Sequence, residues 1–210
     1  MGTDSKPGNL LKCKYMFQPQ LVRVTLLSVL SVTWASFAQA ETDTHQAFFA
    51  NLKKLCGQQF EGETKFPQDP EHPLVGKKLI MSVASCTENE LRIPFQVGED
   101  KSRTWILTLT DKGLLFKHDH RHEDGTPDKI TMYGGWAAAD GTAYSQKFPA
   151  DADTAKLIPE AVTNVWKLEI NPKAEQFSYS LERHGKPRYE AVFDLKSANK
   201  APQGRPTSQS

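Results

Sequence analysis

The chain has 210 residues, of which 26 are basic and 25 acidic, so its formal net charge is +1. This balance provides no basic surface of the kind that nucleic-acid-binding proteins carry, which argues against that class of partner. The length suits a single domain with one sizeable core. No internal repeat and no Pro- or Gly-rich linker interrupts residues 41–195.

The N-terminal segment predicts export from the cytoplasm. Residues 24–40 (VTLLSVLSVTWASFAQA) follow a basic residue and end with small residues at the −3 and −1 positions of a cleavage site, as in a secretory signal peptide. The stretch is too short and too rich in Ser and Thr for a membrane span. We expect a signal peptide over residues 1–40, with Met16 as an alternative start. The mature chain should begin near Glu41 and be periplasmic or extracellular, with no membrane span.

Two cysteines remain after that cleavage, and they predict a disulfide. Without residues 1–40 the chain has 22 basic and 24 acidic residues, a net charge of −2, and retains Cys56 and Cys86. An even pair in an oxidising compartment is normally bonded, and no CxxC spacing indicates a reactive or metal-binding pair instead. The cross-link should stabilise the fold by roughly 3–4 kcal/mol on the chain-entropy model.

The mature chain is predicted to begin with an amphipathic helix. It should start at Asp43 or Thr44 and end at Gly57, which suits the position after a helix terminus. Apolar residues recur on one face at three- and four-residue spacing. They are Phe48, Phe49, Leu52, Leu55 and Cys56. The Cys56 thiol is therefore expected on the buried face, bonded to the strand that carries Cys86.

Beyond the helix the hydrophobic period becomes two, which indicates β-strands. We expect about nine strands joined by short connections, with residues 59–66 as a candidate tenth. The others are residues 79–86, 91–97, 104–110, 114–121, 129–137, 142–148, 165–170, 177–182 and 188–195. This pattern predicts a mainly β fold, an antiparallel up-and-down β-barrel rather than a sandwich, within a single domain over residues 41–195. A short helical excursion is expected within residues 149–164, and a disordered tail over residues 196–210.

Three local features predict strand pairing. Leu168 should lie opposite Tyr179, and a three-residue loop over 185–187 should place Tyr179 opposite Phe193, which makes one face of three strands apolar. Asp140-Gly141 predicts a hairpin between the strands that flank it. Pro94 predicts an edge or a bulge in its strand.

The segment GQQFEG, which follows the helix, leads into the predicted meander. Gly57 with Phe60 approximates a Gly-x-Trp motif, with one extra residue and no Trp. In layout, residues 57–195 resemble the calycin superfamily, which contains the lipocalins, the fatty-acid-binding proteins and related haem-binding barrels. The resemblance implies a cavity for a small ligand.

The densest polar stretch, KHDHRHEDG over residues 117–125, is the candidate functional site. A three-residue loop would pair Thr110 with Leu114 and place all three alternating histidines on the face of Leu114, which we expect to point inward. These are His118, His120 and His122. Neighbouring imidazoles on such a face lie about 6.6–7 Å apart and can converge on zinc, copper or haem iron, with a further ligand from another strand.

Two other interpretations of these histidines remain open. They can be structural, hydrogen-bonded near a strand end, or they can act in acid–base catalysis. The cupin His-x-His motif, in contrast, places its Glu four or five residues later, whereas Glu123 follows His120 by only three. Glu123 is better explained as part of the turn Glu-Asp-Gly-Thr-Pro.

Charged residues near the same hairpin end are candidates for binding an anionic ligand. Arginines can bind such a ligand bidentately, although exposed ion pairs are an equally simple explanation of these charges. The candidates are Arg92, Arg103, Asp119, Arg121 and Glu123.

The sequence thus predicts a secreted or periplasmic barrel that binds a small ligand or a metal at a His-rich mouth. The alternative is a secreted enzyme that uses a His/carboxylate pair or a metal-activated water. The chain has no G-x-S-x-G, HExxH or Walker motif, which favours binding over catalysis.

Overall fold

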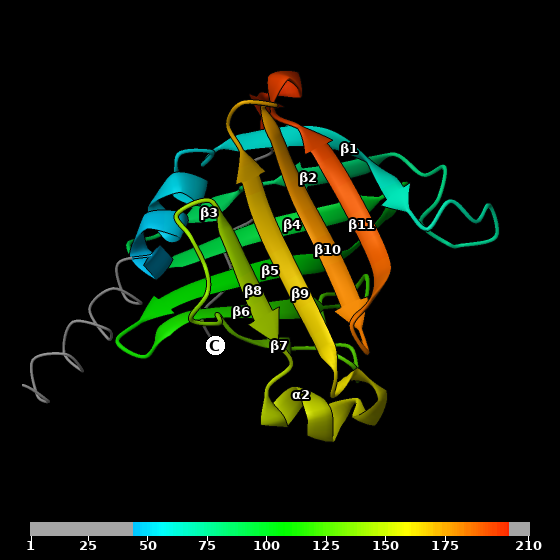
Figure 1. The fold of residues 1–210 in the computed structure, drawn as a ribbon. Coiled ribbons are helices and arrows are strands. Elements are labelled where there is room, and N and C mark those ends of the chain that lie inside the picture. The colour runs from blue at the N-terminus through cyan, green and yellow to red at the C-terminus, as the bar shows by residue number, and fades with distance from the viewer. Residues whose placement is uncertain (1–43, 202–210) are drawn as a thin grey trace, which may run out of the picture.

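A computed structural model describes residues 44–201, which form a mainly β structure. Ten antiparallel strands follow one another around a nearly closed barrel, and the last, β11, returns to pair with β1 (Figure 1). They are β1 (Gln58–Phe66), β2 (Leu79–Ser82), β4 (Glu90–Val97), β5 (Asp100–Thr110), β6 (Gly113–His120), β7 (Tyr133–Trp136), β8 (Ser145–Pro149), β9 (Asn164–Asn171), β10 (Gln176–Arg183) and β11 (Lys186–Asp194). The predicted up-and-down barrel is confirmed.

Apolar residues at every second position of the strands point into the barrel and form its core. Along β4, the apolar members of the alternation are buried while their neighbours are more exposed. The same rule holds in β9 and β10, where Leu168 lies opposite Tyr179 as predicted. Side chains from all around the barrel therefore meet in a single hydrophobic core.

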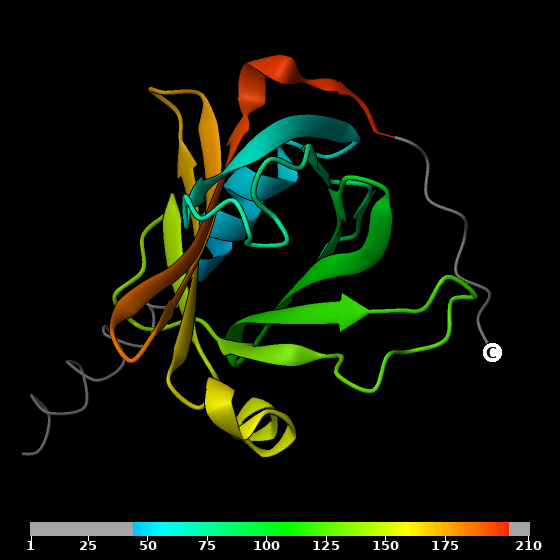
Figure 2. The ribbon, with the colours of Figure 1, turned by 90° about the vertical axis from the view of Figure 1, so that its right-hand side faces the viewer.

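The N-terminal helix, residues 44–53, closes one end of the barrel. Phe48, Phe49 and Leu52 are buried in the core, and Figure 2 shows the helix lying across the far end as the viewer looks into the opposite mouth. The helix ends at residue 53, three residues before the predicted last residue, and the chain turns through residues 54–57, where Gly57 has a φ of +79°. Cys56 consequently lies in this turn and is exposed, so its predicted place on the buried helical face is wrong.

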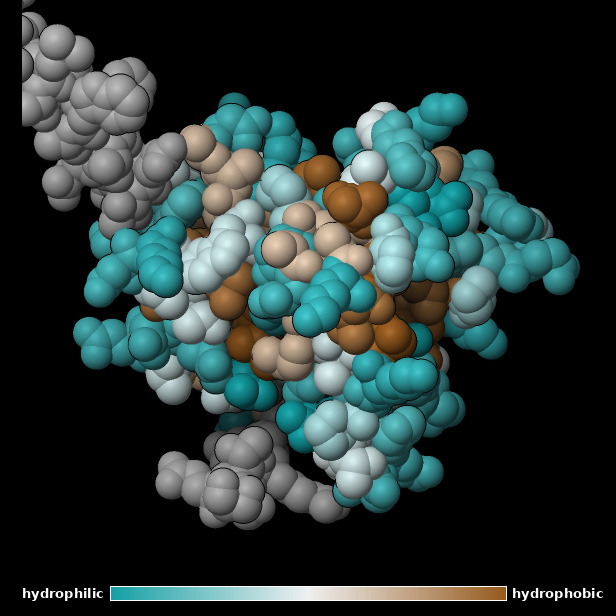
Figure 3. All heavy atoms as spheres, turned by 90° about the horizontal axis from the view of Figure 1, so that it is seen from below, coloured by the Kyte–Doolittle hydropathy of each residue, from teal (hydrophilic) through white to brown (hydrophobic). Residues whose placement is uncertain are grey.

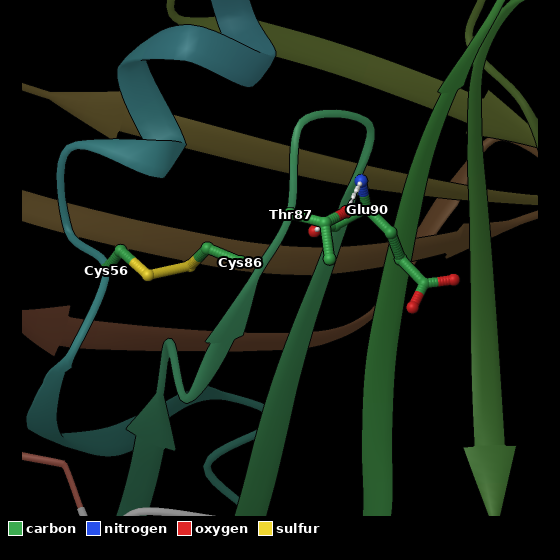
Figure 4. Close-up of a disulfide and its surroundings, with 4 residues drawn as sticks. All are labelled: Cys56, Cys86, Thr87 and Glu90. Carbon is green, nitrogen blue, oxygen red and sulfur yellow. Dashed lines mark hydrogen bonds between the residues drawn. A yellow bond between two sulfur atoms is a disulfide. The ribbon is translucent and has the colours of Figure 1, made fainter. Parts of the chain in front are cut away.

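The predicted disulfide is present and joins this turn to the sheet (Figure 4). Cys86 belongs to β3 (Ser85–Cys86), a short strand that pairs with β4. The predicted strand 79–86 is thus two strands, β2 and β3, with a break at residues 83–84. Pro94 of β4 has no N–H to donate to a neighbouring strand. It lies opposite the break between β2 and β3, and next to a bulge between Phe95 and Val97, so no regular ladder is interrupted on that side.

The pairing of β10 with β11 differs from the prediction. The turn has two residues, His184 and Gly185, both with positive φ, and Tyr179 lies opposite Ala191 rather than Phe193. The shift is two residues, so the side chains from Tyr189 onward keep their predicted faces. The core membership of Phe193 is accordingly unaffected.

The barrel is completed at a seam between β7 and β8. The hairpin predicted around Asp140-Gly141 is not a regular ladder: the seam is held by Ala138 N–H to Lys147 O (2.8 Å) and Asp151 N–H to Gly134 O (3.0 Å). The helix α2 (Ala152–Leu157) covers it, because the buried Thr154 hydroxyl donates to the carbonyl of Gly134 at 2.7 Å. The predicted helical excursion is therefore confirmed. On the face that carries α2, apolar side chains appear among hydrophilic ones (Figure 3).

The ends of the chain were also predicted from sequence. β12 (Asn199–Lys200) pairs with β1, so residues 196–201 belong to the folded unit and the tail predicted from residue 196 begins too early. The predicted signal peptide over residues 1–40 and the rest of the predicted tail lie outside the described residues. Within residues 44–201, no helix is long and apolar enough to cross a membrane.

Candidate binding pocket

A pocket of about 260 Å³ opens at the mouth opposite the N-terminal helix. Its walls come from β4, β5, β6, β7, β10 and β11 and from the loop between β1 and β2. The lining residues are His72, Leu74, Phe95, Arg103, Trp105, His118, His120, Tyr133, Tyr179, Leu181, Arg183, Arg188 and Tyr189. Aromatic and cationic side chains dominate this list.

The register of the β5–β6 hairpin brings the histidines into the pocket. The turn has two residues, so Thr110 pairs with Gly113 and Trp105 pairs with His118; the predicted pairing of Thr110 with Leu114 is wrong by one residue. Trp105 therefore shares the inward face with His118 and His120, and Arg103 lies opposite His120. Gly113 adopts a φ of +116°, which a glycine accommodates at this turn.

His118 is held at both ring nitrogens. Its Nδ1 is 3.2 Å from the carbonyl of Tyr133, and its Nε2 is 3.0 Å from the hydroxyl of Tyr179. A carbonyl only accepts, so Nδ1 carries the hydrogen. Burial lowers the pKa of His118 to about 3, so the ring is neutral near pH 7, and Nε2 accepts the Tyr179 hydrogen.

His120 lies nearer the mouth and contacts Tyr133. Its Nε2 is 3.0 Å from the Tyr133 hydroxyl. Burial and the charge of Arg103 lower the pKa of His120, whereas nearby aspartates raise it less. Burial raises the pKa of Tyr133 to about 12, so this hydroxyl keeps its hydrogen at neutral pH.

Three arginines surround the mouth. Arg103 is paired with Asp100, and Arg183 donates from Nε to the amide oxygen of Asn164 at 2.8 Å. Arg188 is the unpaired extra residue of a β-bulge, because Leu181 lies opposite Tyr189 and Glu182 opposite Pro187. Bulges redirect side chains, which accounts for the presence of Arg188 in the pocket although strict alternation would turn it outward.

Stacked aromatic rings form one wall. The ring centroids of Phe95 and Trp105 are 4.6 Å apart with an interplanar angle of 20°, and those of Trp105 and Tyr179 are 4.6 Å apart at 13°. The Trp105 ring thus lies stacked with both neighbours, and the three rings are almost fully buried in this wall.

The loop over residues 67–78 supplies the opposite rim. His72 stacks on Tyr189, with centroids 5.8 Å apart. The Tyr189 hydroxyl is 3.1 Å from Oγ1 of Thr64, which donates to the carbonyl of Leu74 at 2.9 Å. These contacts tie the loop to β1 and β11.

Of the eight candidate residues predicted from sequence, the structure brings Arg103, His118 and His120 into the pocket. The other five lie outside it. Arg92 pairs with Glu90 on the outer surface, and Asp119 accepts hydrogen bonds from Arg121 and Thr131 under the loop after β6; His122 and Glu123 are exposed in that loop.

The described part of the chain also bears on the metal hypothesis. No group of three or more His, Cys, Asp or Glu side chains within residues 44–201 has an arrangement that could hold a metal ion. Metal binding by the histidines remains a prediction.

Sequence reasoning missed the half of the pocket that lies on late strands. Arg183 could have been found, because it continues the inward alternation of Tyr179 and Leu181. No sequence signal reveals Arg188, whose direction depends on the bulge, or His72, whose place depends on the path of a loop.

Comparison with known proteins assigns neither a family nor a ligand to this pocket. No protein-family model matches the chain, and no curated protein matches it either.

Proposed function

We propose that this protein is an exported binding protein for a small organic anion, which lies in the pocket with its acidic group at Arg183 and Arg188 and its body against the aromatic wall. The observation that carries the proposal is the charge imbalance of the mouth. Within residues 44–201, neither of these two arginines has a carboxylate at ion-pair distance, although both line an aromatic pocket.

The chemistry of the lining narrows the ligand class. Guanidinium groups bind carboxylates through paired, charge-assisted hydrogen bonds. The rings of Phe95, Trp105 and Tyr179 make this wall of the pocket aromatic, which favours an apolar ligand body. A volume of about 260 Å³ suits a small molecule, below the usual range of roughly 300–1,000 Å³ for drug-sized ligands. A small aromatic carboxylate meets all three conditions.

Two alternatives have less support. A metal ligand or a catalytic base needs an imidazole nitrogen with a free lone pair, and Nε2 of His118 already accepts from Tyr179. His122 lies outside the pocket. Export rests on the predicted signal peptide and agrees with the Cys56–Cys86 disulfide.

The proposal can be tested with two ligands of matched shape and opposite charge. Purified mature protein would be titrated with benzoate and with benzylamine, and binding followed by calorimetry and ligand-observed NMR. Benzoate should bind and benzylamine should not. Arg183→Gln should weaken benzoate binding by about tenfold or more, since a charge-assisted hydrogen bond contributes roughly 1.5–3 kcal/mol.

Arg92→Gln is the matched control, because Arg92 is an arginine on the outer surface of the same barrel. It should leave the affinity for benzoate unchanged. Equal binding of benzylamine, or equal losses in Arg183→Gln and Arg92→Gln, would contradict the proposal.

A further inference from the structure

The hydrogen of the Tyr189 hydroxyl is committed to the protein. Thr64 Oγ1 donates to the carbonyl of Leu74, which can only accept, and a threonine hydroxyl has a single hydrogen. The contact of 3.1 Å between Thr64 Oγ1 and the Tyr189 hydroxyl must therefore have Tyr189 as its donor. The Tyr189 oxygen is left with only its lone pairs for any further partner.

The hydrogen of the Tyr179 hydroxyl is committed in the same way. The carbonyl of Tyr133 requires the hydrogen of His118 on Nδ1, so Nε2 accepts from Tyr179. The Tyr179 hydroxyl is thereby engaged as a donor.

Each of the two hydroxyls thus begins a chain of hydrogen bonds that ends at a backbone carbonyl, and this fixes the direction in which its hydrogen is donated. Neither hydroxyl has a hydrogen left for a ligand. Tyr189 in addition has no donor to its oxygen among the hydrogen bonds of residues 44–201. Tyr189 lines the pocket, so its oxygen can accept a hydrogen bond from a ligand there.

We infer that the ligand is an anion that also carries a hydroxyl or amino group, such as a hydroxy- or amino-substituted aromatic carboxylate, and that this group donates a hydrogen bond to the oxygen of Tyr189. The inference rests on the proposed function and names a narrower ligand class for the same pocket. A site that hydrogen-bonds a polar group of its ligand discriminates strongly against analogues without it, because its own polar atom then remains unpaired.

The test compares ligands that differ only in this group. Mature protein would be titrated with the 3- and 4-hydroxybenzoates, the 3- and 4-aminobenzoates, the corresponding methoxybenzoates and benzoate. At least one hydroxy or amino isomer should bind about tenfold more tightly than both benzoate and its own methoxy analogue. The methoxy compounds retain the oxygen but cannot donate.

Three variants connect the preference to Tyr189. Tyr189→Phe should abolish it, because the acceptor is gone. Thr64→Val should free the Tyr189 hydrogen and shift the preference toward the methoxy analogue, since the hydroxyl can now donate to the ligand. Thr64→Ser retains the hydroxyl and should retain the preference, with melting temperatures measured to compare the folding of all three variants.

The outcomes separate the two proposals. If no carboxylate of the series binds, the proposed function fails, and this inference fails with it. If the carboxylates bind with the expected dependence on Arg183 but hydroxy, amino, methoxy and plain compounds bind equally, the proposed function stands and the donor requirement is wrong. A preference that survives Tyr189→Phe would also overturn the assignment.

Discussion

The hydroxyl of Tyr179 donates a hydrogen bond of 3.0 Å to Nε2 of His118, across the inside of the barrel. Tyr179 belongs to β10 and His118 to β6, which are not neighbours in the sheet. The bond therefore joins two separate parts of the wall, and with the Tyr133 carbonyl on Nδ1 it fully engages the neutral imidazole. His118 thus acts as a structural support for the pocket.

Removing this imidazole should destabilise the protein. His118 is 3% exposed, and His118→Ala would leave a cavity together with an unpaired hydroxyl and an unpaired carbonyl. The expected loss in the free energy of unfolding is about 3–5 kcal/mol. His122→Ala changes an exposed histidine of the same stretch and should cost less than about 0.5 kcal/mol. Denaturant unfolding measures both, and similar small losses would show that His118 is not structural.

The same residue should make stability depend on pH. Burial lowers the pKa of His118 from 6.5 to about 3, so between these values the unfolded chain binds a proton that the folded protein does not. The contribution of His118 is present above pH 6.5, declines as the pH falls and is lost as the pH passes through about 3. Unfolding curves between pH 7 and pH 4 should show this decline.

His118→Gln is the comparison for that measurement, because it removes the titrating group but retains polar atoms. Its stability should fall less between pH 7 and pH 4 than that of the wild type. Parallel declines in the two proteins would assign the pH dependence to other groups, such as His120, whose pKa is also lowered.

The seam between β7 and β8 should be sensitive to one methyl group. A Cβ added at Gly135 would lie 1.7 Å from the carbonyl oxygen of Pro149, a backbone atom that cannot swing away. Gly135→Ala should therefore force the seam apart and cost about 3 kcal/mol or more. Gly125→Ala meets nothing within 4 Å and should cost only about 1–2 kcal/mol for its φ of +86°. Thermal unfolding of both variants would reveal the difference, and equal costs would mean that the seam can adjust.

Reduction of the Cys56–Cys86 disulfide should lower the free energy of unfolding by roughly 3–4 kcal/mol, because the bond closes a loop with a sequence separation of 30. The double variant Cys56→Ser/Cys86→Ser should match the reduced wild type. Urea unfolding with and without reductant provides the measurement, and reductant should leave the double variant unaffected. An unchanged midpoint for the wild type would show that the bond does not contribute to stability.

The two hairpins whose pairing differs from the prediction show how far alternation can determine a fold. In β10–β11 the difference is two residues, so the side chains beyond the bulge, from Tyr189 onward, keep their faces, and the predicted core is right although the partners are wrong. In β5–β6 the difference is one residue, which decides whether Trp105 shares a face with His118. Alternation within either strand is the same in both registers, so only packing in the barrel selects between them.

Sequence by itself determined the strands, the meander, the helix that precedes it and the disulfide. Alternation and turn residues are local signals, and two cysteines allow only one pairing. Sequence also identified Arg103, His118 and His120, which lie on one hairpin. Only the tertiary structure showed that these three residues share a pocket with Arg183, Arg188 and Tyr189. Closure of the barrel brings together residues as far apart in sequence as His118 and Tyr179, a separation of 61. The direction of Arg188 depends on a bulge in the pairing of β11 with β10, which the alternation along either strand does not reveal because it arises only when the two strands pair.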